Sequence, residues 1–498
     1  MTTDIRLQRD SLTEPDGLNP ADDLPFQWTK QWYPVAVIEC LDPSRPHPIQ
    51  LLGNDLVIWC DRTGQWRCFA DACPHRSAPL SEGRVEADGT LLCAYHGWRF
   101  APDGGCDRIP QAPDPATEAK HCANPKSCAI AYPTQARQGL LWVWAEPGSE
   151  AQVESQLREP RLIPELEQGS DRVVKMFWNI RDLPYGWDFF MENVADPAHV
   201  PVAHHGLVGD RYNDAKYYDM PRIREMSTQD GCAFGVTPTA STIREAVHDF
   251  QPPCHMRIAT TFDDGGMLIL ALYATPTRPG WCRHIGCQVL VKNDTGKTPK
   301  GLAFFALPMP SWLGHVLASL FLHQDLVFLH YQEKIVAKRH PQRWLDQVYT
   351  PNPQDKMVIA IRQWLEKRAG GAIPWASSSD LPPPEYDKQK LFDVWATHTQ
   401  HCQICQNALK TITRMTTTLF ALAVVGLLLG ILIDAQYVAT QAAIATLDHL
   451  PFSWSTVMPP AGVWLAWGGA ALCAVGGYLL KQFSRLFYVY EFEHAHND

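Results

Sequence analysis

Residues 73–96 read CPHRSAPLSEGRVEADGTLLCAYH and contain two short ligand pairs, Cys73-Pro-His75 and Cys93-Ala-Tyr-His96. The pairs are 17 residues apart and follow the order Cys, His, Cys, His. Thiolates and imidazoles at such spacing are the side chains that hold zinc and iron–sulfur centres. The stretch therefore predicts a metal site built from the tips of two loops.

Two kinds of metal site fit these four side chains. A Rieske [2Fe–2S] centre has two cysteines on one iron and two histidines on the other. A zinc site usually pairs like with like, as C-x2–4-C and H-x3–5-H, whereas each pair here joins unlike residues. We therefore expect Cys73, His75, Cys93 and His96 to bind a [2Fe–2S] cluster.

The surrounding sequence predicts an α+β protein with several parts. Short apolar runs broken by turn residues, typical of a small antiparallel β domain, extend from about 32 to 147. Strand-like stretches then precede helical ones at 312–340 and 355–368, which indicates an α+β domain. The expected parts are a flexible arm (1–25), the [2Fe–2S] domain (26–148), a catalytic α+β domain (149–368), a linker (369–412), two transmembrane helices (413–485) and a tail (486–498).

Composition excludes some classes of function. The chain has 498 residues and a net charge of −10, and its Lys and Arg form no basic tract, which argues against nucleic acid as a partner. Fifteen cysteines at irregular spacing favour reduced thiols or metal ligands over a disulfide framework. Residues 1–25 contain no apolar stretch, so we expect neither a secretory signal nor a transit peptide.

Two segments near the end of the chain predict membrane spans. Residues 415–433 and 450–480 carry no charge, and about 20 apolar residues cross the ~30 Å hydrocarbon layer. A buried hairpin is the alternative. The flanking cations are Lys410, Arg414, Lys481 and Arg485. Because Lys and Arg that flank membrane spans are enriched on the cytoplasmic side, the large N-terminal region and the C-terminus should face the cytoplasm.

A second candidate metal site lies in residues 192–205, ENVADPAHVPVAHH. His199 and His204 are five residues apart, about 140° around a regular helix, so an unbroken helix would not aim both at one metal. Pro197 and Pro201 supply a distortion. Pro201 lacks an N–H and its ring crowds the carbonyl of Pro197, so we expect a kink there. The kink would let both imidazoles converge.

A distant carboxylate completes this candidate site. Asp325 lies at the edge of an apolar stripe formed by Leu322, Leu326 and Leu329. A carboxylate on a buried face must be paired or coordinate a metal, so a hydrogen-bonded core Asp is the alternative. Two His and one carboxylate with open positions form the facial triad of non-haem Fe(II) oxygenases.

Both motifs resemble those of Rieske ring-oxidising oxygenases. Respiratory Rieske proteins carry an additional cysteine in each loop, where this chain has Ala78 and Tyr95. The spacing Asn-x2-Asp-x2-His-x4-His over residues 193–204 is similar to the mononuclear-iron motif of the oxygenases. The resemblance implies a β Rieske domain joined to a helix-grip-like α+β catalytic domain.

The resemblance also implies roles for single residues. His199, His204 and Asp325 would bind Fe(II), and the family spacing favours His204 over its neighbour His205. Asp196 would connect His199 to the Rieske histidine of a neighbouring subunit, which implies a homotrimer. Substrate-pocket residues are expected within 210–310, without individual roles.

Further stretches resemble one group, the pheophorbide a oxygenases with their Tic55-type and protochlorophyllide-type relatives. They are WTKQWYPVAVIECLD (28–42), YHGWRF (95–100), IPQAP (109–113), the ENVADPAHVPVAHHG segment (192–206) and the C-terminal spans. Membership implies a membrane-anchored monooxygenase that uses O₂ and ferredoxin electrons on a chlorophyll-type tetrapyrrole. The expected location is a cyanobacterial thylakoid or plasma membrane, with the catalytic domains on the cytoplasmic side.

The sequence also fits other functions. Oxidation of protochlorophyllide or chlorophyllide, of a phyllobilin or of a sterol is an alternative, as is a membrane redox sensor or electron carrier without oxygenase activity. Cys402-x2-Cys405 precedes the first span. It could be a redox dithiol, proposed in the family as a thioredoxin target, a metal site with His398 and His401, or a pair without a role.

Overall fold

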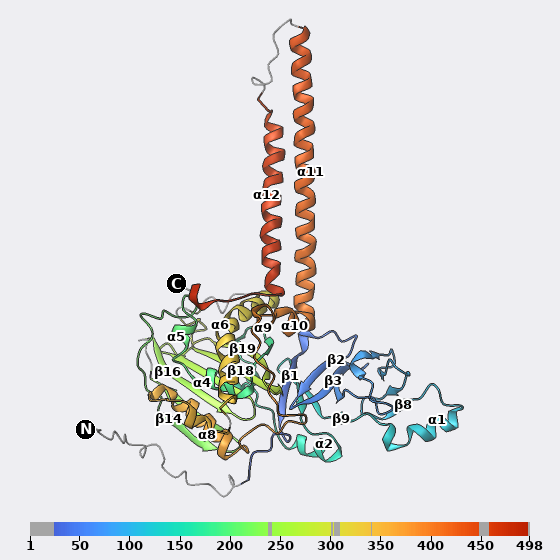
Figure 1. The fold of residues 1–498 in the computed structure, drawn as a ribbon, viewed down its shortest axis with the longest axis vertical. Coiled ribbons are helices and arrows are strands. Elements are labelled where there is room, and N and C mark those ends of the chain that lie inside the picture. Colours follow the sequence, from blue (N-terminus) through green and yellow to red (C-terminus); the bar gives the residue numbers. More distant parts are fainter. Residues whose placement is uncertain are drawn as a thin grey trace, which may run out of the picture. The chain divides into compact units, whose positions relative to one another are not determined.

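The structure is a computed structural model that describes residues 24–237, 242–299, 302, 309–339, 341–447 and 458–496. Most of the expected arm, residues 450–457 of the second expected span and the last two residues lie outside this part of the chain. The chain divides into a larger unit, Met1–Tyr386 with Phe492–Asp498, and a smaller unit, Asp387–Glu491. Figure 1 labels helices and strands of both units.

Three small antiparallel sheets form the first part of the larger unit. Their strand orders are β1-β11-β10, β2-β3-β4-β9 and β5-β6-β7-β8. The bounds are β1 (Trp32–Val37), β2 (His47–Leu51), β3 (Asn54–Cys60), β4 (Trp66–Ala70), β5 (Arg84–Val85), β6 (Leu91–Leu92), β7 (Arg99–Phe100), β8 (Cys106–Arg108), β9 (Ala131–Tyr132), β10 (Thr134–Arg137), β11 (Leu140–Trp144) and helix α1 (Pro115–Cys122). Cys73 and Cys93 belong to the apolar core of this region, with Trp59, Phe69 and Phe100.

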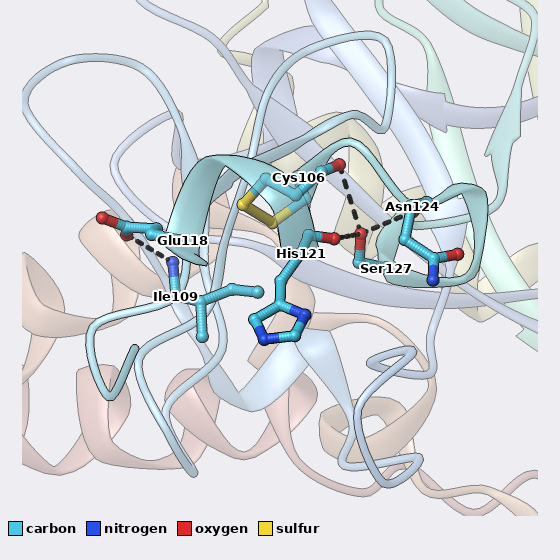
Figure 2. Close-up of a disulfide and its surroundings, with 7 residues drawn as sticks. Cys106, Ile109, Glu118, His121, Asn124 and Ser127 are labelled. Carbon is cyan, nitrogen blue, oxygen red and sulfur yellow. Dashed lines mark hydrogen bonds between the residues drawn. A yellow bond between two sulfur atoms is a disulfide. The ribbon is translucent and has the colours of Figure 1, made fainter. Parts of the chain in front are cut away.

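A disulfide joins Cys106 in β8 to Cys122, the last residue of α1 (Figure 2). Beside it, the Glu118 carboxylate accepts a hydrogen bond of 2.8 Å from the N–H of Ile109. The prediction of reduced thiols is wrong for this pair, because α1 packs back against β8 and brings together two cysteines 16 residues apart. Spacing alone does not reveal such a return of the chain.

One antiparallel sheet of eight strands dominates the second part of the larger unit. Its order is β12-β19-β18-β17-β16-β15-β14, and β13 also pairs with β19. The bounds are β12 (Val173–Lys175), β13 (Asn179–Leu183), β14 (Arg222–Ser227), β15 (Gly231–Val236), β16 (Ile243–Gln251), β17 (His255–Phe262), β18 (Met267–Arg278) and β19 (Trp281–Val291). Together with the helices that pack on it, this sheet confirms the α+β class.

Helices α4, α6 and α8 pack on this sheet, α4 against β17, β18 and β19, α6 against β13, and α8 against β15. Their contact with the sheet is rich in aromatic rings, with Trp187 of α4 and Trp364 of α8 both near Phe250 of β16. Fully buried aromatic side chains supply much of the apolar burial in a core. The helices are α2 (Ser149–Gln156), α3 (Pro164–Glu167), α4 (Trp187–Ala195), α5 (Val200–Ala203), α6 (Ser311–Ala337), α7 (Trp344–Gln347) and α8 (Lys356–Lys367).

Helix α6 is tied by hydrogen bonds to the turn that precedes α4. His330 Nδ1 donates to the carbonyl of Pro184 over 2.6 Å, and Glu333 Oε1 accepts from the N–H of Gly186 over 2.9 Å. The same glutamate pairs with Lys334 at 2.8 Å, and both side chains are buried. These bonds fix the position of α6 relative to the start of α4.

The smaller unit contains two long apolar helices, as the two uncharged segments predict. They are α11 (Gln403–Leu447) and α12 (Ala461–Ser484), preceded by the short helices α9 (Lys388–Leu391) and α10 (Val394–Thr397). Small residues allow close approach: a Cβ on Gly426 would lie 3.2 Å from the Cβ of Ala470. Small residues at contacts are typical of helix pairs in lipid.

In the part of the chain that the structure describes, three helices are long and apolar enough to cross a membrane: α6, α11 and the helix beginning at Ala461. Half of the apolar window of α6 is buried within the protein, against 6% for α11 and 17% for the helix from Ala461. Helix α6 also buries His323, Asp325 and Glu333, which lipid would not solvate. We therefore assign α6 to the core of the larger unit and treat the other two helices as candidate spans.

Glu333 predicts a pH dependence of stability. Burial, and then the charge of Asp188, raise the pKa of Glu333 from 4.5 to about 7. The folded state thus holds a proton that the unfolded state loses, so this group's stabilising contribution declines as pH rises from about 4.5 to about 7. We expect the unfolding temperature of the wild type, relative to E333Q, to fall across that window in thermal melts. An unfolding temperature of the wild type that rises relative to that of E333Q as the pH rises would contradict this.

The Cys106–Cys122 disulfide predicts a local loss of stability on removal. A crosslink that closes a loop of about 15 residues contributes roughly 3 kcal/mol in the chain-entropy model. The C106S/C122S variant should lose the visible circular dichroism of the cluster at lower denaturant concentration than wild type. The variant C128S, which changes a free cysteine of the same region, is the control and should unfold like wild type.

Candidate functional site

The two cysteine–histidine pairs lie in loops with matching backbone hydrogen bonds. The N–H of Ser77 donates to the carbonyl of Cys73 over 2.8 Å, and that of Gly97 donates to the carbonyl of Cys93 over 2.9 Å. Ser77 and Gly97 both have positive φ, 55° and 71°. Each loop therefore turns sharply four residues after its cysteine, which aims both pairs at a common space.

The cysteines and the histidines occupy opposite sides of that space. Cys73 and Cys93 are 3% and 1% exposed, whereas His75 is exposed and His96 is half-buried. The two imidazole rings lie 4.6 Å apart, and His75 stacks on Trp98 at 4.7 Å. Burial raises the pKa of Cys73 to about 11, so two adjacent thiolates need a cation there. The arrangement fits a [2Fe–2S] cluster with cysteines inward and histidines outward.

The second motif lies where the helical course breaks. Helix α4 ends at Ala195, and Asp196 has extended backbone angles, φ −94° and ψ 105°. A residue that precedes a proline avoids the helical region, so Pro197 ends α4. The expected kink at Pro201 is wrong in position, because Pro201 lies in the first turn of α5, where a missing N–H costs little.

The break brings together the three predicted iron ligands. Asp325 Oδ2 lies 3.2 Å from His204 Nε2 and 3.8 Å from His199 Nε2. One ligand atom from each of the three lies within 4.8 Å of the others. Asp325 is 6% exposed and His204 is fully buried. Two segments far apart in sequence, the one that carries His199 and His204 around α5 and the helix α6, thus converge on one point.

Both imidazoles are oriented for metal binding. His204 Nδ1 donates to Gln324 Oε1 over 2.8 Å, and His199 Nδ1 donates to the carbonyl of Asp196 over 2.5 Å. A ligand histidine usually anchors its other nitrogen in this way, which fixes the tautomer. Among the described residues, His204 Nε2 is buried without a hydrogen-bond partner. The side chains therefore fit a 2-His-1-carboxylate iron site.

Asp196 lies beside the triad. Its Oδ1 accepts from the N–H of Ala198 over 2.7 Å, and its Oδ2 is 3.8 Å from His199 Nδ1. Burial raises the pKa of Asp196, while the nearby His199 opposes this effect. Its side chain remains 29% exposed. The role expected for it between subunits stays a prediction.

His205 points elsewhere, although it directly follows His204. Its Nδ1 accepts a hydrogen bond of 3.0 Å from the N–H of Arg211. His205 therefore supports the loop after α5, and the triad takes His204.

A cavity of about 540 Å³ adjoins the triad. Its volume lies within the usual range of about 300–1,000 Å³ for small-molecule sites. Of its lining residues, Arg211 falls in the range 210–310 where pocket residues were expected. The others are Phe189, Glu192, Asn193, Asp196, His199, Val202, Ala203, Asp325, Phe328, Leu329, Gln332, Val336, Trp344, Val348, Thr350, Asp355, Val358 and His494.

Sequence reasoning missed the residues that support the triad. Gln324 holds His204, and the ring of Phe321 stacks on His204 at 3.9 Å. Phe321 precedes Asp325 by one helical turn and shares its face, a signal that could have been used. Gln324 offered no such signal, because its contact with His204 spans 120 residues.

Cys402 and Cys405 are buried cysteines of the smaller unit, each 1% exposed. His398 Nε2 lies 3.2 Å from Cys405 Sγ, whereas the exposed His401 meets the side chain of Gln400. The assignment of the two cysteines as a redox dithiol stays a prediction.

Comparison with known proteins identifies the family. Residues 31–123 match the Rieske [2Fe-2S] domain, and residues 250–343 match the pheophorbide a oxygenase family. A chloroplastic pheophorbide a oxygenase of Oryza sativa subsp. japonica is 36% identical over 415 residues, which cover 80% of this chain and 75% of the relative. The chain belongs to this family. It is a Rieske non-haem iron oxygenase with a [2Fe–2S] cluster and a mononuclear iron.

Other similar proteins act on different molecules. Flavonoid 8-hydroxylase 2 of Ocimum basilicum is 30% identical over 465 residues, 89% of this chain and 85% of the relative. The crystal structure of dicamba monooxygenase bound to dicamba matches with a TM-score of 0.52 at 19% identity, covering 69% of this chain and 97% of that one. The structural likeness supports the fold alone.

The predicted cyanobacterial thylakoid or plasma-membrane location, with catalytic domains on the cytoplasmic side, is wrong by these comparisons. Five relatives that match 77–94% of this chain at 25–36% identity are named as chloroplastic proteins. The prediction depended on the composition of residues 1–25, which carries much less information than alignments of about 400 residues.

The anchoring of His204 predicts a measurable effect on iron binding. Q324L removes the acceptor for His204 Nδ1 and should weaken Fe(II) binding about 10- to 100-fold, the usual cost of losing such support. Q324E keeps an acceptor oxygen and should bind iron more tightly than Q324L. Competition with a coloured chelator measures both affinities, and equal values for Q324L and wild type would contradict the role of Gln324.

Proposed function

We propose that the chain is a membrane-anchored Rieske monooxygenase that inserts oxygen into a chlorophyll-type tetrapyrrole, with pheophorbide a as the first candidate substrate. The observation that carries the proposal is the cavity shared by Asp196, His199 and Asp325, which adjoins the iron site. Relatives named pheophorbide a oxygenase, at 33–36% identity over about three quarters of their length, favour this substrate class.

The residues have distinct proposed roles. Cys73 and Cys93 hold one iron of the cluster, and His75 and His96 hold the other. When bound, the cluster supplies single electrons and the mononuclear iron supplies the site at which O₂ is activated.

A second group of residues holds the mononuclear metal. His199 and His204 offer their Nε2 atoms, because both Nδ1 atoms are occupied by hydrogen bonds. Asp325 offers a carboxylate, and its negative charge offsets part of the charge of Fe(II). Burial of His204 and Asp325 keeps bulk water from competing for these two ligands.

The overall reaction balances with an external reductant. One C–H bond of the substrate becomes C–OH, and the second oxygen atom of O₂ leaves as water. This requires two electrons and two protons, and we propose a ferredoxin-type protein as the electron donor. The exposed His75 and half-buried His96 are accessible to such a donor.

Asp196 has a proposed role between copies of the chain. Its carbonyl holds His199, and its carboxylate is partly exposed. We propose that this carboxylate contacts His96 of a neighbouring copy in a homotrimer. His96 lies near the surface, where such a contact is possible.

The cavity and the apolar helices suit an apolar substrate. Phe328, Leu329, Val336 and Trp344 supply apolar surface, and Arg211 supplies a positive charge suited to a carboxylate. Tetrapyrrole pigments partition into lipid, so α11 and α12 would hold the enzyme at the membrane where the substrate collects. Protochlorophyllide, chlorophyllide and phyllobilins are alternatives of the same class. The flavonoid hydroxylase relative favours a flavonoid as a second candidate.

The activity test uses the full chain in lipid nanodiscs with reduced ferredoxin and O₂. Pheophorbide a, protochlorophyllide, a phyllobilin and a flavone are supplied separately, and products are identified by mass spectrometry. We expect a product that is heavier by one oxygen atom and takes its label from ¹⁸O₂. Consumption of none of the tetrapyrroles would overturn the substrate class.

Two matched histidine variants separate an oxygenase from an electron carrier. H204A should lower iron from about three to about two atoms per chain and abolish product, because a triad ligand is lost. H205N keeps an acceptor for the N–H of Arg211 and should retain both the iron content and the product formation of the wild type. Product formation by H204A at the wild-type rate would overturn the triad assignment, and two irons in the wild type would favour a carrier.

A further inference from the structure

A second cluster of metal-binding side chains lies in the smaller unit, apart from both redox centres. His398, Cys402 and Cys405 each place one ligand atom within 4.8 Å of the others. His398 is 5% exposed, and Cys402 and Cys405 are each 1% exposed. The oxygenase reaction proposed above uses none of these three side chains.

Local backbone structure explains why the three converge. Cys402 directly precedes α11, and Cys405 lies in its first turn. Residues three apart face the same side of a helix, so both sulfur atoms point one way. His398 follows α10, and its N–H donates to the carbonyl of Val394 over 2.9 Å. The turn of residues 399–401 then returns the chain to α11, with His398 Nε2 3.2 Å from Cys405 Sγ.

We propose that His398, Cys402 and Cys405 bind one Zn²⁺ ion. Two sulfur ligands and one imidazole nitrogen form a donor set typical of zinc. The three ligands leave one position of a tetrahedral ion for water or a further side chain. Binding releases two thiol protons and transfers no electrons. The two thiolates that result balance the two positive charges of Zn²⁺.

The histidine distinguishes a zinc site from a simple dithiol. A disulfide switch needs two sulfur atoms, whereas here an imidazole nitrogen is buried against one of them. His401, an alternative ligand by sequence, is exposed and meets the Gln400 side chain instead.

The proposed ion would have a structural role. It would join the segment around α10 to the first turn of α11, the long apolar helix. Structural zinc sites contribute directly to folding free energy. The ion would thereby fix the point at which the chain enters α11.

Metal analysis of the full chain tests the proposal. The protein carries an affinity tag without histidine and is purified in detergent under reducing conditions from zinc-supplemented cells. We expect about one zinc per chain besides the iron, and X-ray absorption at the zinc edge should show two sulfur ligands at about 2.3 Å. Absence of zinc, or a Cys402–Cys405 disulfide found by mass spectrometry in this preparation, would overturn the proposal.

Variants and a direct thiol measurement complete the test. H398Q and C402S/C405S should lose the zinc while the iron content and the Rieske spectrum stay unchanged, and H401Q should keep the zinc. Zinc retained by C402S/C405S would overturn the assignment. If these variants fail to fold, the wild type still decides: a zinc chelator should accelerate alkylation of Cys402 and Cys405, and an unchanged rate would contradict zinc ligation. Neither readout depends on oxygenase activity.

Discussion

Two imidazole rings turn their Nε2 atoms toward the buried carboxylate of Asp325, and the catalytic half of the molecule is arranged around this convergence. Each ring is anchored through Nδ1, His199 by the carbonyl of Asp196 and His204 by Gln324. Without a cation, a buried carboxylate surrounded by lone pairs would be costly. The hydrogen bonds at Nδ1 orient the rings for metal binding and leave the Nε2 lone pairs facing the carboxylate. The stability of this arrangement therefore depends on a bound metal.

The convergence requires that α4, α5 and α6 keep their relative positions. Pro197 ends α4, so that His199 and His204 leave the helical path that would separate them. The bonds from His330 and Glu333 hold α6 to the turn before α4. Arg362 of α8 pairs with Asp188 of α4 at 2.6 Å, which ties a third helix to the same point. Polar contacts buried between helices thus set the geometry, while aromatic packing supplies most of the apolar burial.

Sequence predicts the parts of this structure that depend on local spacing. The Cys73–His96 stretch carries all four expected cluster ligands within 24 residues, and the structure places them in two loops with matching backbone hydrogen bonds. Uncharged length indicated α11 and α12, and the apolar stripe of α6 placed Asp325 on a buried face. The sequence did not reveal contacts between residues that are far apart in the chain. These are the hydrogen bond between His204 and Gln324, the packing of α1 against β8, and a cavity whose lining residues lie between 189 and 494. The break lies at Asp196 and not at the kink expected at Pro201, because the residue before Pro197 avoids the helical region.

The two redox centres differ in how they are built, and that difference suits their tasks. The cluster ligands come from two adjacent loops whose backbone bonds close within four residues, so this site is preorganised by local structure. The proposed iron ligands come from the two residues that flank α5, His199 and His204, and from α6, and the cavity extends across the same elements. A site assembled from distant elements can place a substrate pocket beside the metal, because each element contributes one face to both. A local loop site cannot enclose a pocket, but it can present its histidines at the surface, where electrons must enter and leave.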